Sequence, residues 1–237
     1  LPLFDKQGTQ SIGNMAIAPS NNNIIYVGTG EANIFRASLP GIGMFKSADA
    51  GKTWQHIGLE NTGTIARVII HPTDALTVYV AAGGNEWSYN NDRGVYQTTD
   101  GGKTWKKILG NDDKTGCIDL RMDPSDPNIS DASMWNRIRK RWSDPVPEDN
   151  DRTYKTTDGG KTWKAVIPGT ENTGATDVVI DPANPDTMYA ATWQRQRSVA
   201  AFIGGGPESG LHRSSDGGTT WERLETGLPE GAMGKIG

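Results

Sequence analysis

An eight-residue pattern that occurs four times constrains the fold of this chain more strongly than any other feature of its sequence. Each copy opens with Ser or Thr, carries a central Asp-x-Gly, and ends in Thr-Trp. The copies span residues 47–54, 98–105, 156–163 and 214–221. Their aspartates, which lie 51, 58 and 58 residues apart, are Asp49, Asp100, Asp158 and Asp216. A period of this length is typical of stacked supersecondary units, so the sequence predicts one structural unit repeated along the chain.

The intervals between the copies contain segments that are typical of short β-strands. Apolar runs that stop at a proline predict first strands at 14–19, 67–72, 119–124 and 177–182. Runs of β-branched and aromatic residues predict second strands at 24–28, 77–81 and 187–191. Third strands are expected at 43–46, 94–97 and 210–213, and fourth strands at 54–57 and 105–108. Each unit is therefore predicted to be a four-stranded antiparallel meander.

These meanders need neighbours, because a single one cannot cover both of its own faces. Radial stacking around an axis buries both faces and leaves only short edges, so the predicted fold class is all-β, a β-propeller segment of about four blades. The blades are expected at residues 11–60, 64–110, 115–168 and 174–226. Residues 1–10 are interpreted as the end of a preceding blade, and residues 231–237 as the start of a further one. Residues 1–237 are thus expected to be a single, incomplete segment of a ring of about six to eight blades.

The repeated turn has a mechanical explanation. Its Asp side chain can accept hydrogen bonds from backbone N–H groups of the turn, its Gly supplies a positive φ, and its Trp packs back across the blade. A residue needed once for chemistry would not recur in every blade, so these positions are interpreted as structural. They are Asp49, Gly51, Trp54, Asp100, Gly102, Trp105, Asp158, Gly160, Trp163, Asp216, Gly218 and Trp221.

The four turns resemble the Asp-box, also called the bacterial neuraminidase repeat. The segments 27–33, 190–197 and 204–210 extend this resemblance to bacterial sortilin-like propellers that are often labelled glycosyl hydrolases. Xyloglucanases and sialidases share the box, and so do noncatalytic propellers such as sortilin and a photosystem assembly factor. The resemblance therefore implies a β-propeller and leaves the activity open. It also implies a secreted, periplasmic or cell-envelope protein, whose export signal is expected outside this chain.

Composition and charge exclude several classes of function. A net charge of -4 argues against a nucleic-acid partner, which requires a basic surface. No apolar stretch is long enough for a membrane span. The only cysteine, Cys117, allows no intrachain disulfide and is interpreted as a buried small residue. His56, His71 and His212 have no spacing typical of a ligand set, so neither a metal nor another cofactor is expected.

The four tryptophans outside the Asp-boxes identify a candidate ligand-binding face. They all follow second strands, and these connections leave a meander at the end opposite the Asp turns. Aromatic faces can stack on sugar rings, while arginines and carboxylates bind hydroxyl or acidic substituents. The candidate residues are Glu31, Arg36, Glu86, Trp87, Trp135, Arg137, Arg139, Arg141, Trp142, Trp193, Arg195, Arg197 and Glu208. Alternatively, the tryptophans cap the blade ends and the arginines pair with local acids.

The leading functional hypothesis is a noncatalytic ligand- or glycan-binding interaction module of a secreted or envelope-associated bacterial protein. The alternative is part of a sialidase- or xyloglucanase-like glycoside hydrolase whose cleft is completed by blades outside this chain. Hydrolysis requires two carboxyl groups at a defined separation, which a sequence does not give, so no catalytic residue is assigned. A purely structural assembly surface is a third hypothesis. The expected partners are a glycan or peptide, the remaining blades, or a second copy that pairs through open blade edges.

The third blade departs from its siblings in its second strand and again just before its Asp-box. Ser130 and Asp131 stand where the other blades have an apolar residue followed by Tyr, and Arg152 and Thr153 replace a Gly-apolar pair. Polar groups at core positions cost stability unless they are paired. Two explanations are open: the strand register shifts here, or this blade borders a hydrated region.

Overall fold

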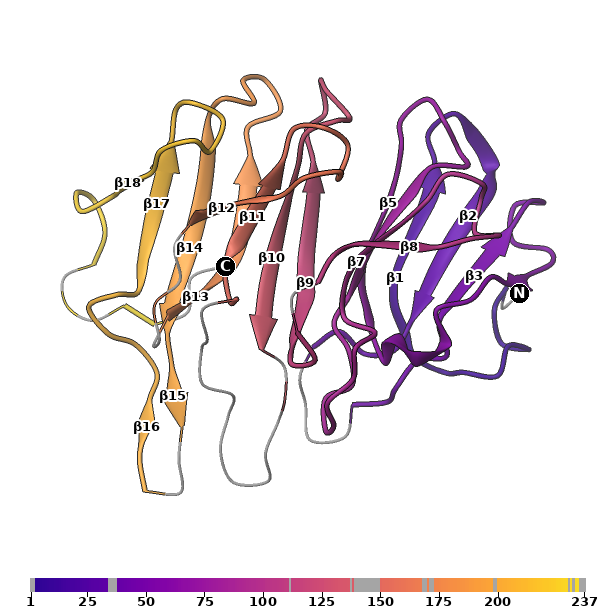
Figure 1. The fold of residues 1–237 in the computed structure, drawn as a ribbon, viewed down its shortest axis with the longest axis horizontal. Helices are drawn as coiled ribbons and strands as arrows, with labels where there is room; N and C mark the ends of the chain where they lie inside the picture. Colours follow the sequence, from indigo (N-terminus) through magenta and orange to yellow (C-terminus); the bar gives the residue numbers. More distant parts are fainter. Residues whose placement is uncertain are drawn as a thin grey trace. The chain divides into compact units, whose positions relative to one another are not determined.

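The computed structural model describes residues 3–33, 38–110, 112–136, 138, 150–167, 170, 173–197, 200–229, 231 and 233–234. Within these ranges the chain forms β-strands and one short 3-10 turn, η1 (Glu60–Thr62) (Figure 1). Four four-stranded antiparallel sheets follow one another along the sequence. The predicted all-β fold of repeated four-stranded meanders is therefore confirmed.

The first two sheets have their strands in sequence order. The first contains β1 (Ile12–Ala18), β2 (Asn21–Thr29), β3 (Met44–Ser47) and β4 (Gln55–His56). The second contains β5 (Ile65–Ile70), β6 (Val78–Ala82), β7 (Gly94–Thr98) and β8 (Lys106–Leu109). In both sheets the connection between the second and third strands therefore lies at the end opposite the Asp turn.

The last two sheets repeat this order, and the fourth carries an insertion. The third sheet contains β9 (Thr115–Met122), β10 (Ser130–Asn136), β11 (Thr153–Thr156) and β12 (Lys164–Ile167). The fourth contains β13 (Thr173–Ile180), β14 (Met188–Gln194), β17 (Gly210–Ser214) and β18 (Glu222–Arg223). The inserted strands β15 (Gln196–Arg197) and β16 (Phe202–Ile203) pair with each other.

The chain divides into two compact units, Leu1–Leu120 and Arg121–Gly237, with the boundary inside β9. The first unit contains the first and second sheets, and the second unit contains the fourth sheet and most of the third. That residues 1–237 form one continuous propeller segment stays a prediction.

The core of the first unit lies between its two complete sheets. Tyr26 and Met44 of the first sheet belong to the same buried cluster as Ile65 and Val78 of the second. A Cβ atom at Gly28 would lie 2.2 Å from the Cγ2 atom of Ile65, so this close approach of the sheets requires a glycine. Burial of such side chains contributes about 1.5–3 kcal/mol each, which makes this layer the main source of stability in the unit.

Residues near the start of the chain cover the opposite face of the first sheet. Phe4 packs edge-to-face against Phe45, with ring centroids 5.2 Å apart, and against Trp54, at 5.1 Å. The Trp54 Nε1–H group donates to the carbonyl oxygen of Leu3 at 2.7 Å. In the second sheet, Trp105 Nε1–H donates at 2.7 Å to the carbonyl oxygen of Ile57, just after β4. The Leu3 carbonyl thus accepts the indole hydrogen bond of the first sheet, just as the Ile57 carbonyl accepts that of the second sheet.

Each Asp turn uses both oxygens of its carboxylate within the turn itself. In the second turn, Asp100 Oδ1 accepts from the Thr98 hydroxyl at 2.7 Å and from the Thr104 N–H at 3.0 Å, and Oδ2 accepts from the Thr104 hydroxyl at 2.6 Å. Gly101 and Gly102 have φ values of 75° and 93°, which L side chains rarely adopt. The same bonds recur at the other three aspartates, Asp49, Asp158 and Asp216.

Donors in the turns stabilise the ionised aspartates. Hydrogen bonds from Thr53 lower the pKa of Asp49 to about 2, and equivalent bonds lower the pKa values of Asp158 and Asp216 to about 2. The pKa of Asp100 is lowered for the same reason. These bonds fix the reversal between the third and fourth strands of each sheet.

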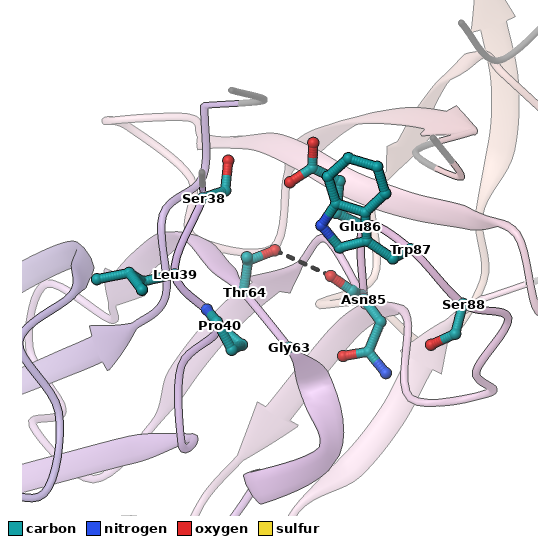
Figure 2. Close-up of a pocket in the computed structure, with 10 residues that line it drawn as sticks. Ser38, Leu39, Pro40, Gly63, Thr64, Asn85, Glu86, Trp87 and Ser88 are labelled. Carbon is teal, nitrogen blue, oxygen red and sulfur yellow. Dashed lines mark hydrogen bonds between the residues drawn. The ribbon is translucent and has the colours of Figure 1, made fainter. Parts of the chain in front are cut away.

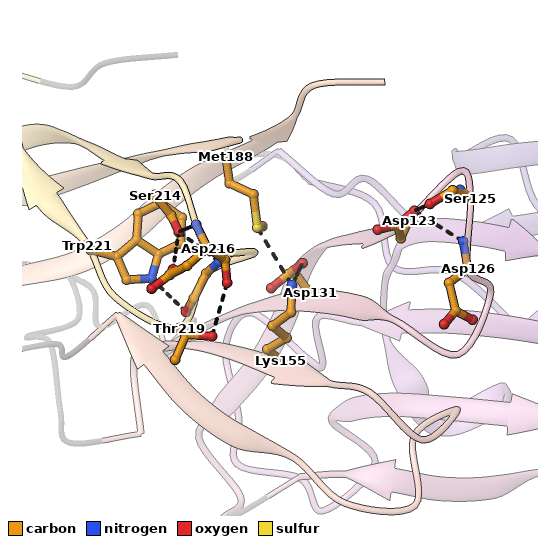
Figure 3. Close-up of polar contacts among 11 residues, drawn as sticks. Asp123, Ser125, Asp126, Asp131, Lys155, Met188, Ser214, Asp216, Thr219 and Trp221 are labelled. Atoms are coloured by element: carbon orange, nitrogen blue, oxygen red, sulfur yellow. Dashed lines mark hydrogen bonds and ion pairs between the residues drawn. The ribbon is translucent and has the colours of Figure 1, made fainter. Parts of the chain in front are cut away.

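The third sheet keeps its register at the position where its sequence departs from the others. Asp131 of β10 lies opposite Lys155 of β11, and the pairing from Ser130 to Ser133 has no shift. The Asp131 side chain is fully buried, and its Oδ2 atom lies 3.5 Å from Lys155 Nζ. Figure 3 shows Lys155 reaching both Asp131 and the sulfur of Met188, which lies 3.6 Å from Nζ. The register therefore does not shift, and the polar side chain is buried and ion-paired.

Candidate ligand-binding site

A pocket of about 200 Å³ in the first unit is formed where two strand connections meet (Figure 2). Residues 38–40 of the β2–β3 connection form one side, and residues 84–88 of the β6–β7 connection form the other. Residues 63–64, just before β5, complete the lining. Both connections were expected to carry ligand-binding residues, and the structure brings part of each to one pocket.

A buried arginine organises the β6–β7 connection. Arg93 has no solvent exposure, and its guanidinium donates to the carbonyl oxygens of Gly83 at 3.0 Å and Ser88 at 2.8 Å. It also donates to the carbonyl oxygen of Asn85. Gly84 has a φ of 83°, and a Cβ atom there would lie 2.4 Å from Arg93 Cγ. The connection therefore wraps around the guanidinium, which fixes the backbone that carries the pocket residues.

Glu31 holds the β2–β3 connection closed. Its Oε2 atom accepts a hydrogen bond from the N–H of Leu39 at 3.0 Å, and its own N–H donates to the Leu39 carbonyl at 3.0 Å. The N–H of Gly41 donates to the Gly63 carbonyl at 2.6 Å. These bonds place Leu39 and Pro40 against the pocket, so Glu31 acts here by positioning the backbone.

Glu86 and Trp87 give the pocket its chemical character. Figure 2 shows them on one wall, across from Leu39 and Pro40. Glu86 is 6% exposed, whereas the Trp87 side chain is 54% exposed. The Thr64 hydroxyl donates to the Gly84 carbonyl at 3.2 Å, which joins the floor of the pocket to this wall. The site thus presents one largely buried carboxylate beside one solvent-facing indole.

In the second unit, Trp193 and Arg195 form a stacked group. The Trp193 Nε1–H donates to the Gly204 carbonyl at 3.1 Å. The Arg195 guanidinium carbon lies 4.8 Å from the Trp193 ring centroid and 5.9 Å from that of Phe202 in β16. Trp135 is half-buried in β10. The Arg195 guanidinium thus stacks on two neighbouring aromatic rings.

The third acidic candidate in the described residues, Glu208, is held by two threonines. Its Oε2 atom accepts from the hydroxyl of Thr170 at 2.6 Å and from that of Thr173 at 2.5 Å. These bonds lower the pKa of Glu208, with the Thr170 bond the larger cause. A carboxylate stabilised in this way stays ionised at neutral pH and is poorly suited to donate a proton.

Several predicted site residues lie outside the described residues, namely Arg36, Arg137, Arg139, Arg141 and Trp142. Arg197 lies in β15, and its side chain is likewise not described. Within the described ranges, no group of three or more His, Cys, Asp or Glu side chains is arranged to hold a metal ion. No helix in the same ranges is long and apolar enough to cross a membrane. Cys117 is buried, and burial raises the pKa of its thiol.

The repeated four-stranded sheets with their shared turn define a chain of the β-propeller class. A family model described as "Sortilin, neurotensin receptor 3" matches residues 43–173, which is more than half of the chain. The chain therefore belongs to the Sortilin-Vps10 family.

Similar proteins with curated names are xyloglucanases. A probable oligoxyloglucan-reducing end-specific xyloglucanase of Neosartorya fischeri is 24% identical over 94% of this chain and 28% of its own length. Xyloglucanase Xgh74A of Acetivibrio thermocellus is 27% identical over 70% of this chain and 21% of its own length. This chain thus spans about a quarter of the length of these relatives.

Solved structures support the same fold. The GH74 enzyme of Niastella koreensis superposes with a TM-score of 0.59 at 22% identity, covering 88% of this chain and 28% of that one. The GH74 xyloglucanase of Xanthomonas campestris gives a TM-score of 0.61 at 18% identity, covering 90% of this chain and 29% of that one. The recognition of a sortilin-like, glycosyl-hydrolase-like propeller is confirmed.

Proposed function

We propose that this chain is a noncatalytic glycan-binding segment of a secreted or cell-envelope protein, and that the Glu86–Trp87 pocket binds one sugar residue of a neutral polysaccharide. The observation that carries the proposal is the solvent-facing Trp87 on a connection fixed by buried Arg93. A large exposed indole on a preorganised backbone loses little conformational entropy when a sugar ring stacks on it.

The size and polarity of the pocket fit a single sugar ring. Its volume of about 200 Å³ is below the ~300–1,000 Å³ of pockets that enclose drug-sized ligands. A longer glycan would therefore place one ring here and extend beyond it. Leu39 and Pro40 supply an apolar wall, and Glu86 lines the pocket with its carboxylate oxygens buried beneath the surface. The similarity to xyloglucanases favours a β-glucan that bears side-chain sugars as the ligand.

Binding without hydrolysis is favoured by the carboxylates present. Glycoside hydrolysis requires a pair of carboxyl groups about 5–9.5 Å apart. Among the described residues that line the pocket, Glu86 is the sole acid. The carboxylate of Glu31 is used to hold the Leu39 N–H. The pocket therefore has the features of a binding subsite.

Calorimetric titration of the chain with a xyloglucan oligosaccharide tests the proposal. Trp87→Ala is expected to weaken binding by about tenfold or more, equivalent to about 1.4 kcal/mol. Tyr89→Ala is the matched control, because Tyr89 is 55% exposed on the same connection but does not line the pocket. Absence of binding by the folded wild-type chain, or equal losses in the two variants, would contradict the proposal.

The similarity to xyloglucanases favours a second function, in which this chain contributes one wall of a hydrolytic cleft. The longer protein that contains this segment would then release reducing ends from xyloglucan, and Glu86→Gln would remove that activity while Tyr89→Ala would retain it. Turnover that is unaffected by Glu86→Gln would exclude this carboxylate from catalysis.

A further inference from the structure

A second, larger groove lies between the first and second sheets, on the side of their Asp turns. Its volume is about 610 Å³, and its walls come from β3, β4 and the second Asp turn. The residues that matter here are Lys46, Trp54, Gln55, Asp100, Lys103 and Trp105. None of them belongs to the Glu86–Trp87 pocket. The groove is therefore a separate site with its own chemistry.

Two ammonium groups give the groove a positive excess. Lys46 Nζ lies 5.4 Å from the ring centroid of Tyr26 and donates to the Gly101 carbonyl at 3.3 Å, which leaves further donors on the same nitrogen. Lys103 is exposed, and its ammonium has no hydrogen bond or ion pair with any residue that the structure describes. Burial, followed by the charge of Lys103, lowers the pKa of Lys46. The two cations thus act on each other across the groove.

The one acid in the groove does not neutralise these cations fully. Both oxygens of Asp100 accept hydrogen bonds from Thr98 and Thr104 inside the Asp turn. These bonds hold its pKa far below the usual range, so Asp100 contributes one fixed negative charge against two lysines. An added anion would face two donors that are only partly used by the protein.

The aromatic walls of the groove are fixed in place. Trp105 Nε1–H is bonded to the Ile57 carbonyl at 2.7 Å, and Trp54 Nε1–H to the Leu3 carbonyl at 2.7 Å. The exposed Gln55 amide makes no hydrogen bond with other described residues. The groove thus combines preorganised indoles, a free amide and two ammonium groups, which suits a ligand with an apolar ring face, hydroxyls and an anionic group.

We infer that this groove binds a carboxylate-bearing sugar, a uronic acid residue of a polysaccharide. The carboxylate would lie between Lys46 and Lys103, with the sugar ring against an indole and a hydroxyl on Gln55. An extended peptide fits less well, because β4 has only two residues and offers too short an edge for strand addition. The volume of the groove lies within the range of pockets that hold small ligands.

Titration of the chain with trigalacturonic acid, followed by calorimetry and by the NMR shift of the Gln55 side-chain amide, tests this inference. We expect saturable binding that weakens as ionic strength rises from about 0.05 to about 0.5 M. Lys103→Ala should weaken binding by about tenfold, and Lys103→Arg should retain it. Lys52→Ala is the matched control, since Lys52 holds the equivalent place in the first Asp turn and does not line the groove.

Two comparisons make the test decisive. The fully methyl-esterified trisaccharide keeps the sugar rings but lacks the charges, so it should bind at least about tenfold more weakly. Equal binding of the ester, no binding of the acid, or tighter binding of a hexaglutamate peptide would each overturn the inference. Trp87→Ala should leave trigalacturonate binding unchanged, so this outcome is separate from that of the neutral-glycan proposal.

Discussion

The first and third sheets place a lysine at the same register position and use it differently. In the first sheet, Lys46 of β3 pairs with Tyr26 of β2, and its ammonium lies over the tyrosine ring. In the third sheet, Lys155 of β11 pairs with Asp131 of β10, and its ammonium lies 3.5 Å from the carboxylate. Tyr26 and Asp131 are both buried. One backbone register thus accommodates either an aromatic ring or a buried charge.

The difference shows how one side chain decides what its partner can do. Tyr26 has its own acceptor, because its hydroxyl donates to the Ala75 carbonyl at 2.9 Å, and it needs no cation for stability. Asp131 has lost its hydration, so it requires Lys155 as a counter-ion. Lys46 is therefore available to the groove, whereas Lys155 is used inside the protein. A lysine at this position contributes to a surface site only where its cross-strand partner is neutral.

The largest expected effect comes from removing each lysine in turn. Lys155→Met leaves Asp131 buried without a counter-ion and should lower the free energy of unfolding at pH 8 by about 3–5 kcal/mol. Lys46→Met should cost about 1 kcal/mol or less, since only a cation–π contact and one hydrogen bond are lost. Urea unfolding of both variants measures the difference. If the two variants lost similar free energies of unfolding, the ion pair of the third sheet would not be the source of the difference between the two lysines.

The second prediction concerns pH. Burial raises the pKa of Asp131 to about 6 in the folded protein, although Lys155 opposes the shift. Because the folded pKa lies above the unfolded value, the stabilisation is present below about pH 4 and is lost as the pH rises through 6. This group should therefore lower the free energy of unfolding by about 2–3 kcal/mol between pH 4 and pH 7.

Asp131→Asn removes the contribution of Asp131 to the pH dependence of stability, because the amide does not titrate. The difference between wild type and variant should change mainly between about pH 4 and pH 6, where the Asp turns stay ionised and contribute no slope. Urea midpoints at several pH values within that window provide the measurement. Parallel profiles would mean that Asp131 has an ordinary pKa in the folded state.

The smallest expected effect on stability concerns the first Asp turn, which has alanine at a position where the other three have glycine. Ala50 has a φ of 58° at the position where the second turn has Gly101, with a φ of 75°. An L residue in this left-handed region costs about 1–2 kcal/mol, part of which the greater flexibility of glycine in the unfolded chain offsets. Ala50→Gly should therefore raise the free energy of unfolding by about 0.5–1 kcal/mol. A loss of stability would show that the first turn has adapted to alanine.

Several features were predictable because their chemistry is local. An Asp turn forms from hydrogen bonds within seven residues, so its sequence pattern carries its structure. The same holds for strands that end at Pro and for the order of strands in each sheet. Repetition at a fixed period then predicted stacked four-stranded meanders. The sequence also singled out Glu86 and Trp87, because both stand in a connection of unusual composition; both line a pocket, and their role in ligand binding stays a prediction.

Other features depended on contacts between distant residues. Arg93 was not predicted, because its acceptors are backbone carbonyls, which every residue carries and which no sequence pattern marks. The hydrogen bond from the Leu39 N–H to the Glu31 carboxylate was likewise not predicted, and a ligand-binding role of Glu31 stays a prediction. The groove beside Lys46 exists only because residues 54–57 and the second Asp turn meet in space.

The sequence by itself determined the repeated sheets and their turns, because each is built from interactions between near neighbours in the chain. The tertiary structure alone decided which side chains face a pocket and which satisfy a buried partner. The choice between those roles depends on burial and on the position of acceptors from other strands. Asp131 shows this most clearly: it is an unexplained polar residue in the sequence and an ion-paired core residue in the fold.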